Sequence, residues 1–131
     1  MKTTLAADVS APGQARAFLI AQLETTRLPE GVPIDKVVLI ASELVTNAVQ
    51  AGATIVEIGV NVTEGRLDLV VTDDAGGWPT PTSPTPDDTA GRGLLIVEQL
   101  ADAWDVAARK HGKAVTVSWF DQSALRIGTD F

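Results

Sequence analysis

The chain has 131 residues, of which 45% are hydrophobic and 21% charged, and its formal net charge is −7. This length and composition predict one globular domain with its own core. The acidic balance argues against nucleic-acid binding through a general electrostatic surface, which needs clustered Lys and Arg. The chain has no cysteine, which excludes disulfides, thiolate catalysis and cysteine-bound zinc. No signal-like or membrane-spanning apolar run is present, so we expect a cytoplasmic protein without membrane contact.

The chain begins with a weakly alternating segment, residues 3–9, which predicts an edge strand. A helix is expected from about Ser10 to Thr26, with Ser10 or a neighbour as its cap and Pro12 in its first turn. The positions that recur at helical spacing, and that we expect to face the core, are Phe18, Leu19 and Leu23.

The second predicted helix, residues 34–51, is apolar on most sides, which is typical of a buried helix. Its polar side chains share one face because they recur three and four positions apart: Glu43, Thr46, Asn47 and Gln50. One interpretation is a solvated face. The other is a face that lines a polar pocket or a bound ion, which the lack of Lys and Arg in residues 37–51 favours. Gly52 is expected to end the helix.

Residues 54–62 and 66–72 alternate and are joined by a short turn, which predicts two antiparallel strands. The next segment, residues 73–92, is rich in proline and has no aliphatic side chain larger than alanine. It is therefore either a disordered insertion or a functional loop. A third helix is expected from Gly93 to about Ala103.

The last predicted strands are residues 104–109 and 113–120. Strands in antiparallel pairs and helices in separate runs predict an α+β fold, with a mixed, mostly antiparallel sheet and helices on one face. We expect residues 1–121 to form a single domain and residues 122–131 a C-terminal tail.

Two patterns between residues 43 and 77 suggest a binding site. Glu43 and Asn47 lie one helical turn apart, so an amide oxygen that can coordinate Mg²⁺ stands near a carboxylate that can orient or deprotonate a hydroxyl. Asp73 leaves a strand into a turn with Gly76 and Gly77, which suits a hydrogen bond to an exocyclic amine and the close approach of a planar ring. An ordinary Asp/Gly turn would have the same sequence.

A third pattern, Gly91-Arg92-Gly93-Leu94, stands at the expected start of the third helix. Backbone amides and the helix dipole attract an anion there, so the pattern suits a polyphosphate. It is neither a Walker A sequence nor a Rossmann fingerprint, and by itself it could be a flexible hinge.

In this order, the three patterns resemble the boxes of the GHKL ATPase superfamily, which includes gyrase, heat-shock chaperone, histidine kinase and mismatch-repair ATPases. Residues 43–48 look like its N box, residues 73–77 like its Asp-x-Gly-x-Gly box, and residues 91–94 like its second glycine box. The small size and the ending from Gly112 to Val117 are most similar to the anti-sigma factor serine/threonine kinases of bacteria and to small actinobacterial ATP-binding regulators.

The resemblance implies a Bergerat-type two-layer α/β sandwich that binds ATP and Mg²⁺. Glu43 would be the general base, Asn47 would bind the magnesium, and Asp73 would hold the adenine amino group. Residues 74–90 would form a lid over the nucleotide. The residues implied at the nucleotide through their backbone, with Arg92 as a possible side-chain contact, are Gly77, Gly91, Arg92, Gly93 and Leu94.

The implied function is transfer of the ATP γ-phosphate to Ser or Thr of a small antagonist protein. The partners that the resemblance implies are a sigma factor, the antagonist protein or both, and a homodimer is a further possibility. A catalytically weak binding module, in which ATP orders the lid and gates a partner, is the alternative. Ala75 stands where the family pattern has glycine, so a backbone position that needs φ > 0 would be strained or altered.

Overall fold

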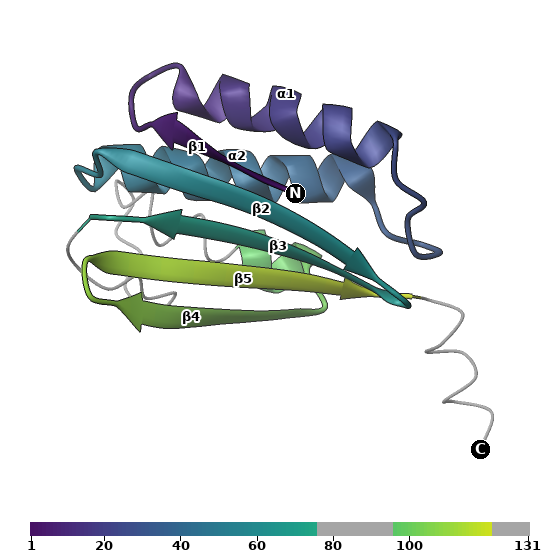
Figure 1. Ribbon diagram of the computed structural model, residues 1–131. Coiled ribbons are helices and arrows are strands. Elements are labelled where there is room, and N and C mark those ends of the chain that lie inside the picture. The colour runs from purple at the N-terminus through teal and green to yellow at the C-terminus, as the bar shows by residue number, and fades with distance from the viewer. Residues whose placement is uncertain (76–95, 122–131) are drawn as a thin grey trace.

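The computed structural model describes residues 1–75 and 96–121, and within them five strands form a single sheet. Figure 1 shows α1 and α2 lying together on one side of this sheet. Residues 96–100 are also helical. The elements, in chain order, are β1 (Lys2–Ala6), α1 (Ala11–Glu24), α2 (Ile34–Gln50), β2 (Ile55–Thr63), β3 (Arg66–Asp73), β4 (Ala103–Arg109) and β5 (Gly112–Phe120).

The strand order is β1-β2-β3-β5-β4, and each of the four pairings is antiparallel. The predicted α+β class is therefore confirmed, although the described strands include no parallel pair. Strand β1 lies at the edge of the sheet, as expected. The described helices of the chain include none that is long and apolar enough to cross a membrane.

The core lies between the helices and one face of the sheet. Along β3, buried residues alternate with partly exposed ones, because successive side chains point to opposite faces. Leu19 and Leu23 of α1 are buried as predicted, and Phe18 packs against the same core while remaining partly exposed. Trp119 of β5 is 2% exposed, and its indole Nε1 donates a hydrogen bond to the Leu100 carbonyl at 2.9 Å.

The two helices differ in how they begin and end. Ser10 occupies the cap position of α1, but its side chain makes no cap hydrogen bond, because its hydroxyl donates to the Asp8 carboxylate instead. At the end of α2, Gly52 has a φ of 90°, and two backbone bonds, from Gly52 to Val49 and from Ala53 to Ala48, close a Schellman motif. The predicted glycine stop is therefore confirmed.

Candidate functional site

The core face of the sheet becomes polar at one end of the β3–β5 pairing. On this face, apolar side chains of β3 lie opposite apolar side chains of β5 as far as Val71 and Val115, and the next pair on the same face is Asp73 with Lys113. Both side chains therefore point to the side of the sheet that the helices cover. Asp73 is 5% exposed and Lys113 9% exposed, so an ion pair closes the apolar core at this end.

Two hydrogen bonds and an ion-pair contact fix the Asp73 carboxylate. The Lys113 ammonium nitrogen lies 2.9 Å from Oδ2 and 3.2 Å from Oδ1 of Asp73. The backbone N–H of Ala75 donates to Oδ1 at 2.9 Å. The side chain is thus held in one orientation where β3 ends and the chain turns away from the sheet.

Gly112 brings the β4–β5 turn against the backbone of Asp73. Its φ is 104°, and a Cβ atom at this position would lie 1.8 Å from the Asp73 carbonyl oxygen and 2.7 Å from the Asp74 Cα atom. No side chain can occupy that space unless the backbone moves. The turn therefore supports the end of β3 directly.

Ala75 is not strained. None of the non-glycine residues in the described part of the chain has a positive φ, and this includes Ala75. The prediction that the backbone would be strained at this position is therefore wrong. Ala75 is 3% exposed, and its N–H already serves Asp73, so alanine fits this position.

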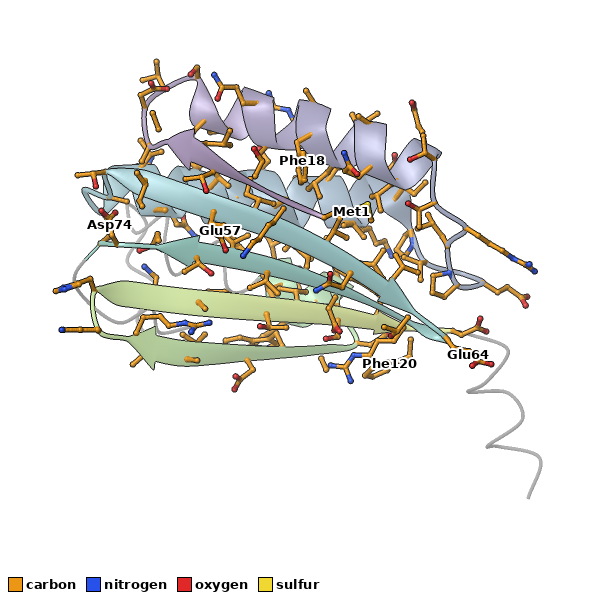
Figure 2. The ribbon with its side chains drawn as sticks, viewed as in Figure 1. Met1, Phe18, Glu57, Glu64, Asp74 and Phe120 are labelled. Atoms are coloured by element: carbon orange, nitrogen blue, oxygen red, sulfur yellow. The ribbon has the colours of Figure 1, made fainter. Side chains whose placement is uncertain are left out.

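Asp74 anchors the end of β3 to the start of β2, and Figure 2 shows it at this end of the sheet. Its Oδ1 accepts hydrogen bonds from the Thr54 N–H at 2.8 Å and the Ile55 N–H at 3.2 Å, and its Oδ2 accepts one from the Thr54 hydroxyl. The Thr54 hydroxyl, followed by the two backbone amides, lowers the pKa of the Asp74 carboxyl below its ordinary value. Asp74 is thus a structural carboxylate beside the predicted site.

The C-terminal half of α2 lies at the same end of the sheet. The Schellman motif ends α2 immediately before Thr54, and Asp74 binds the amide of Thr54. Figure 1 shows the end of α2 beside the start of β2. The helix that carries Glu43 and Asn47 therefore finishes near the end of β3 that carries Asp73.

Asn47 has a buried oxygen atom without a partner. Its Oδ1 makes no hydrogen bond to any described residue, although the residue as a whole is partly exposed. A buried acceptor of this kind is costly unless a ligand or an ion completes it. Thr46, on the same stripe, is satisfied instead, because its hydroxyl donates to the Ser42 carbonyl at 2.8 Å.

This oxygen fits a magnesium ion. Mg²⁺ prefers oxygen ligands and commonly takes few of them from the protein and the rest from phosphates and water. In residues 1–75 and 96–121, no group of three or more His, Asp or Glu side chains could hold a metal. An ion beside Asn47 would therefore need most of its ligands from a bound nucleotide and from water.

Glu43 lies one turn before Asn47 and is partly exposed. It forms no hydrogen bond or ion pair with another described residue. Its carboxylate is therefore available to a ligand or a partner.

The remaining predicted site residues lie outside the described part of the chain. These are Gly77, Gly91, Arg92, Gly93 and Leu94, together with most of the predicted lid. Their roles stay predictions.

For two residues at this end of the sheet, Gly112 and Lys113, no role was predicted. Asp74 was expected to begin the lid, but its carboxylate is bound to the amides of Thr54 and Ile55. A signal for Lys113 exists in the alternation of β5, because it falls in phase with the buried Val115 and Val117. The alternation could not say which strand would lie opposite, so it could not identify Asp73 as the partner of Lys113.

Solved structures with a similar fold place this arrangement among known proteins. The RsbU and RsbW domains of Rv1364c from Mycobacterium tuberculosis are similar over 92% of this chain and 32% of that chain, with 23% identity and a TM-score of 0.67. The histidine kinase domain of the blue-light activated histidine kinase from Erythrobacter litoralis EL346 is similar over 87% of this chain and 61% of that chain, with 18% identity and a TM-score of 0.56. The chain thus spans less than two thirds of the length of either, and at these identities the likeness shows the fold.

A comparison of sequences assigns the family. No curated protein sequence matches the chain significantly. The sequence model of the histidine kinase-like ATPase domain matches residues 5–119, which include α1, α2, β2, β3, β4 and all but the last residue of β5. The chain therefore belongs to the family of histidine kinase-like ATPase domains, and this membership implies that it binds ATP.

Proposed function

We propose that the chain is a regulatory protein kinase of the anti-sigma factor type, which transfers the γ-phosphate of ATP to a Ser or Thr of a small antagonist protein. The family supports ATP binding. The sequence resemblance to anti-sigma factor kinases, and the likeness in fold to a structure that contains an RsbW domain, support the regulatory role. The observation that carries the proposal is the buried, unpartnered Oδ1 of Asn47, one helical turn from Glu43.

Asn47 holds Mg²⁺ in this proposal, since its Oδ1 is the buried acceptor that lacks a partner. The ion supplies positive charge that stabilises the phosphate oxygens during transfer. Asp73 binds the 6-amino group of adenine at the polar end of the β3–β5 pairing. The glycine-rich residues 91–94 cover the phosphates with backbone amides.

Glu43 is the general base. Its carboxylate accepts the proton of the Ser or Thr hydroxyl as the hydroxyl oxygen forms a bond to the γ-phosphorus. The bond from that phosphorus to the bridging oxygen breaks at the same time, and ADP leaves with the electron pair. The partial exposure of Glu43 suits this role, because a protein substrate must reach it.

The partners in this proposal are a sigma factor, the antagonist protein and a second copy of the chain. Release of the sigma factor would follow when the antagonist binds, and phosphorylation of the antagonist would reverse the exchange. This sequence of binding events is the one that the resemblance implies.

The nucleotide site is tested with Asn47→Leu. This substitution removes the unpartnered oxygen, so we expect the melting temperature without nucleotide to stay unchanged or rise. Magnesium-dependent ATP affinity should fall by more than the about 10- to 100-fold that is typical of residues which only support a metal ligand. Calorimetric titration with ATP, with and without Mg²⁺, measures this.

Thr46→Val is the matched control, because the Thr46 hydroxyl is already bonded within the helix. It should leave ATP affinity unchanged. Wild-type affinity in Asn47→Leu would remove the magnesium role from Asn47.

Phosphotransfer is tested by incubating the chain with labelled ATP and its antagonist protein. Glu43→Ala should bind ATP normally and transfer label about 10²- to 10⁴-fold more slowly, which is the usual contribution of a general base. Glu24→Ala, an exposed carboxylate at the end of α1, should transfer label at the wild-type rate. A wild-type chain that binds ATP but transfers no label would instead be an ATP-gated binding module.

A further inference from the structure

The Asp73–Lys113 pair has hydrogen-bonding capacity left over. A carboxylate has about four acceptor positions and an ammonium group three N–H donors. Two acceptor positions on Oδ1 are taken by Ala75 and Lys113. Oδ2 is approached by the Lys113 nitrogen in the ion pair, which occupies at most one of its positions. One acceptor position on Oδ2 and at least one N–H of Lys113 are therefore not used by the described residues.

The unused groups are buried and close together. The Lys113 side chain is 11% exposed and the Asp73 side chain 4% exposed, and the nitrogen lies 2.9 Å from Oδ2. Lysine ordinarily extends its ammonium group to water. A buried donor next to a buried acceptor, each with capacity to spare, indicates a ligand that presents the complementary pair.

The Watson–Crick edge of adenine presents such a pair: the 6-amino group donates and the neighbouring ring nitrogen N1 accepts. We propose that Lys113 is a base-specificity residue, whose ammonium group donates a hydrogen bond to N1 of adenine while Asp73 Oδ2 accepts one from the 6-amino group. The inference rests on the proposed nucleotide site and adds a second point of recognition to it. The cross-strand register and Gly112 keep the two groups side by side.

The same pair disfavours guanine. Guanine presents O6 as an acceptor and N1–H as a donor, so it could meet Lys113 and Asp73 in the opposite order. Its 2-amino group would then face Oδ1 of Asp73, where Ala75 and Lys113 already occupy both acceptor positions. A buried donor without a partner lowers affinity.

The test compares ATP with 1-deaza-ATP, in which N1 is replaced by C–H and the 6-amino group is kept. Calorimetric titration of the wild-type full chain with Mg²⁺ should give about 10- to 100-fold tighter binding of ATP, because a hydrogen bond from a charged donor is lost in the analogue. GTP should bind more weakly than ATP. This comparison uses no substitution, so it does not depend on the folding of a variant.

The same titrations on variants test whether Lys113 causes the preference for ATP over 1-deaza-ATP. Lys113→Met should bind ATP and 1-deaza-ATP equally, and Lys113→Gln, which keeps an N–H donor, should recover part of the preference. Lys110→Met, an exposed lysine in the neighbouring turn, should keep the wild-type preference.

Equal binding of ATP and 1-deaza-ATP by the wild-type chain, or tighter binding of GTP, would overturn this inference and leave the nucleotide site intact. A preference that persists in Lys113→Met would also overturn it. A wild-type chain that binds none of the three nucleotides would overturn the proposed function together with the inference.

Discussion

The two ends of the β3–β5 pairing both carry charged side chains, but on opposite faces of the sheet. At one end, Asp73 and Lys113 lie on the helix-covered face and are buried. At the other end, which Figure 2 marks with Phe120 and Glu64, Arg66 contacts Asp68 at 2.8 Å and Ser118 at 3.2 Å. The Arg66 side chain is 48% exposed, and its guanidinium lies 5.5 Å from the centre of the Phe120 ring.

The difference lies in how completely each group is satisfied. At the Arg66 end, the Ser118 hydroxyl both accepts from Arg66 and donates to Asp68, and water can complete the rest. At the Asp73 end, donor and acceptor capacity remains and water has little access. Charged groups at a sheet end therefore indicate a binding site only when they are buried and incompletely satisfied.

The largest expected effect is the loss of folding free energy when Gly112, one of two turn glycines with positive φ, is replaced. In Gly112→Ala, the added methyl group would meet the Asp73 carbonyl oxygen, 1.8 Å away. We expect a loss of at least about 4 kcal/mol of folding free energy, a size reached only when backbone or core must rearrange. Urea unfolding measures this loss, and ATP titration should show that binding is lost as well.

Gly65→Ala is the matched control at the other end. Its φ is 76°, and the nearest atom to an added Cβ is the Asp121 Cβ, 3.9 Å away. Only the left-handed conformation costs energy there, about 1–2 kcal/mol, and ATP affinity should stay unchanged. Similar losses in both variants would mean that Gly112 does not support Asp73.

The next largest effect is the loss of folding free energy when the cation at either end of the pairing is replaced. Lys113→Met leaves the Asp73 carboxylate buried without its partner, and we expect a loss of about 3 kcal/mol. Arg66→Met breaks an exposed pair and should cost about 1 kcal/mol or less. Both variants keep an apolar stem of similar length, so urea unfolding isolates the head groups. An equal, small loss in both would show that the Asp73 end is as well solvated as the Arg66 end.

The elements that could be predicted from the sequence are those fixed by local patterns. The spacing of apolar residues identified α2, Gly52 identified its end, and the short turn at Gly65 identified the β2–β3 hairpin. Glu43 and Asn47 could be placed on one face because helical geometry is local. Such features depend on neighbours within about one or two turns of the chain.

The remaining features depend on contacts between distant segments. The pairing of β3 with β5 joins residues that are 40 (Asp73 and Lys113) to 54 (Arg66 and Phe120) positions apart in sequence. The alternation of each strand therefore predicted which side chains share a face but not which strand lies beside it. The Asp73–Lys113 pair and the close approach of Gly112 both follow from that register. The same limit explains Asp74, whose partner Thr54 directly precedes a different strand, β2.

The smallest expected effect concerns Asp74, which lies beside the site yet resembles the Arg66 end because its acceptors are satisfied. Its folded-state pKa is lowered from the ordinary value of 3.8, first by the Thr54 hydroxyl and then by two backbone amides. The unfolded chain therefore binds the proton more readily, and stability decreases as the pH is lowered through this range. Asp74 should contribute its full stabilisation above 3.8 and lose it as the pH falls through the lowered pKa.

Thermal unfolding of wild type and Asp74→Asn between about pH 6 and about pH 2 tests this assignment. The wild type should be the more stable at the upper end, and the difference in melting temperature should shrink at the lower end. Asp105→Asn, an exposed aspartate on β4, controls for the loss of one negative charge and should show no such convergence. A difference that stays constant with pH would mean that Asp74 does not hold the start of β2 through its ionised carboxylate. ATP affinity near neutral pH should be the same in Asp74→Asn as in wild type, because Asp74 acts on the strand ends, whereas the residues that we propose to face the nucleotide are Asp73 and Lys113.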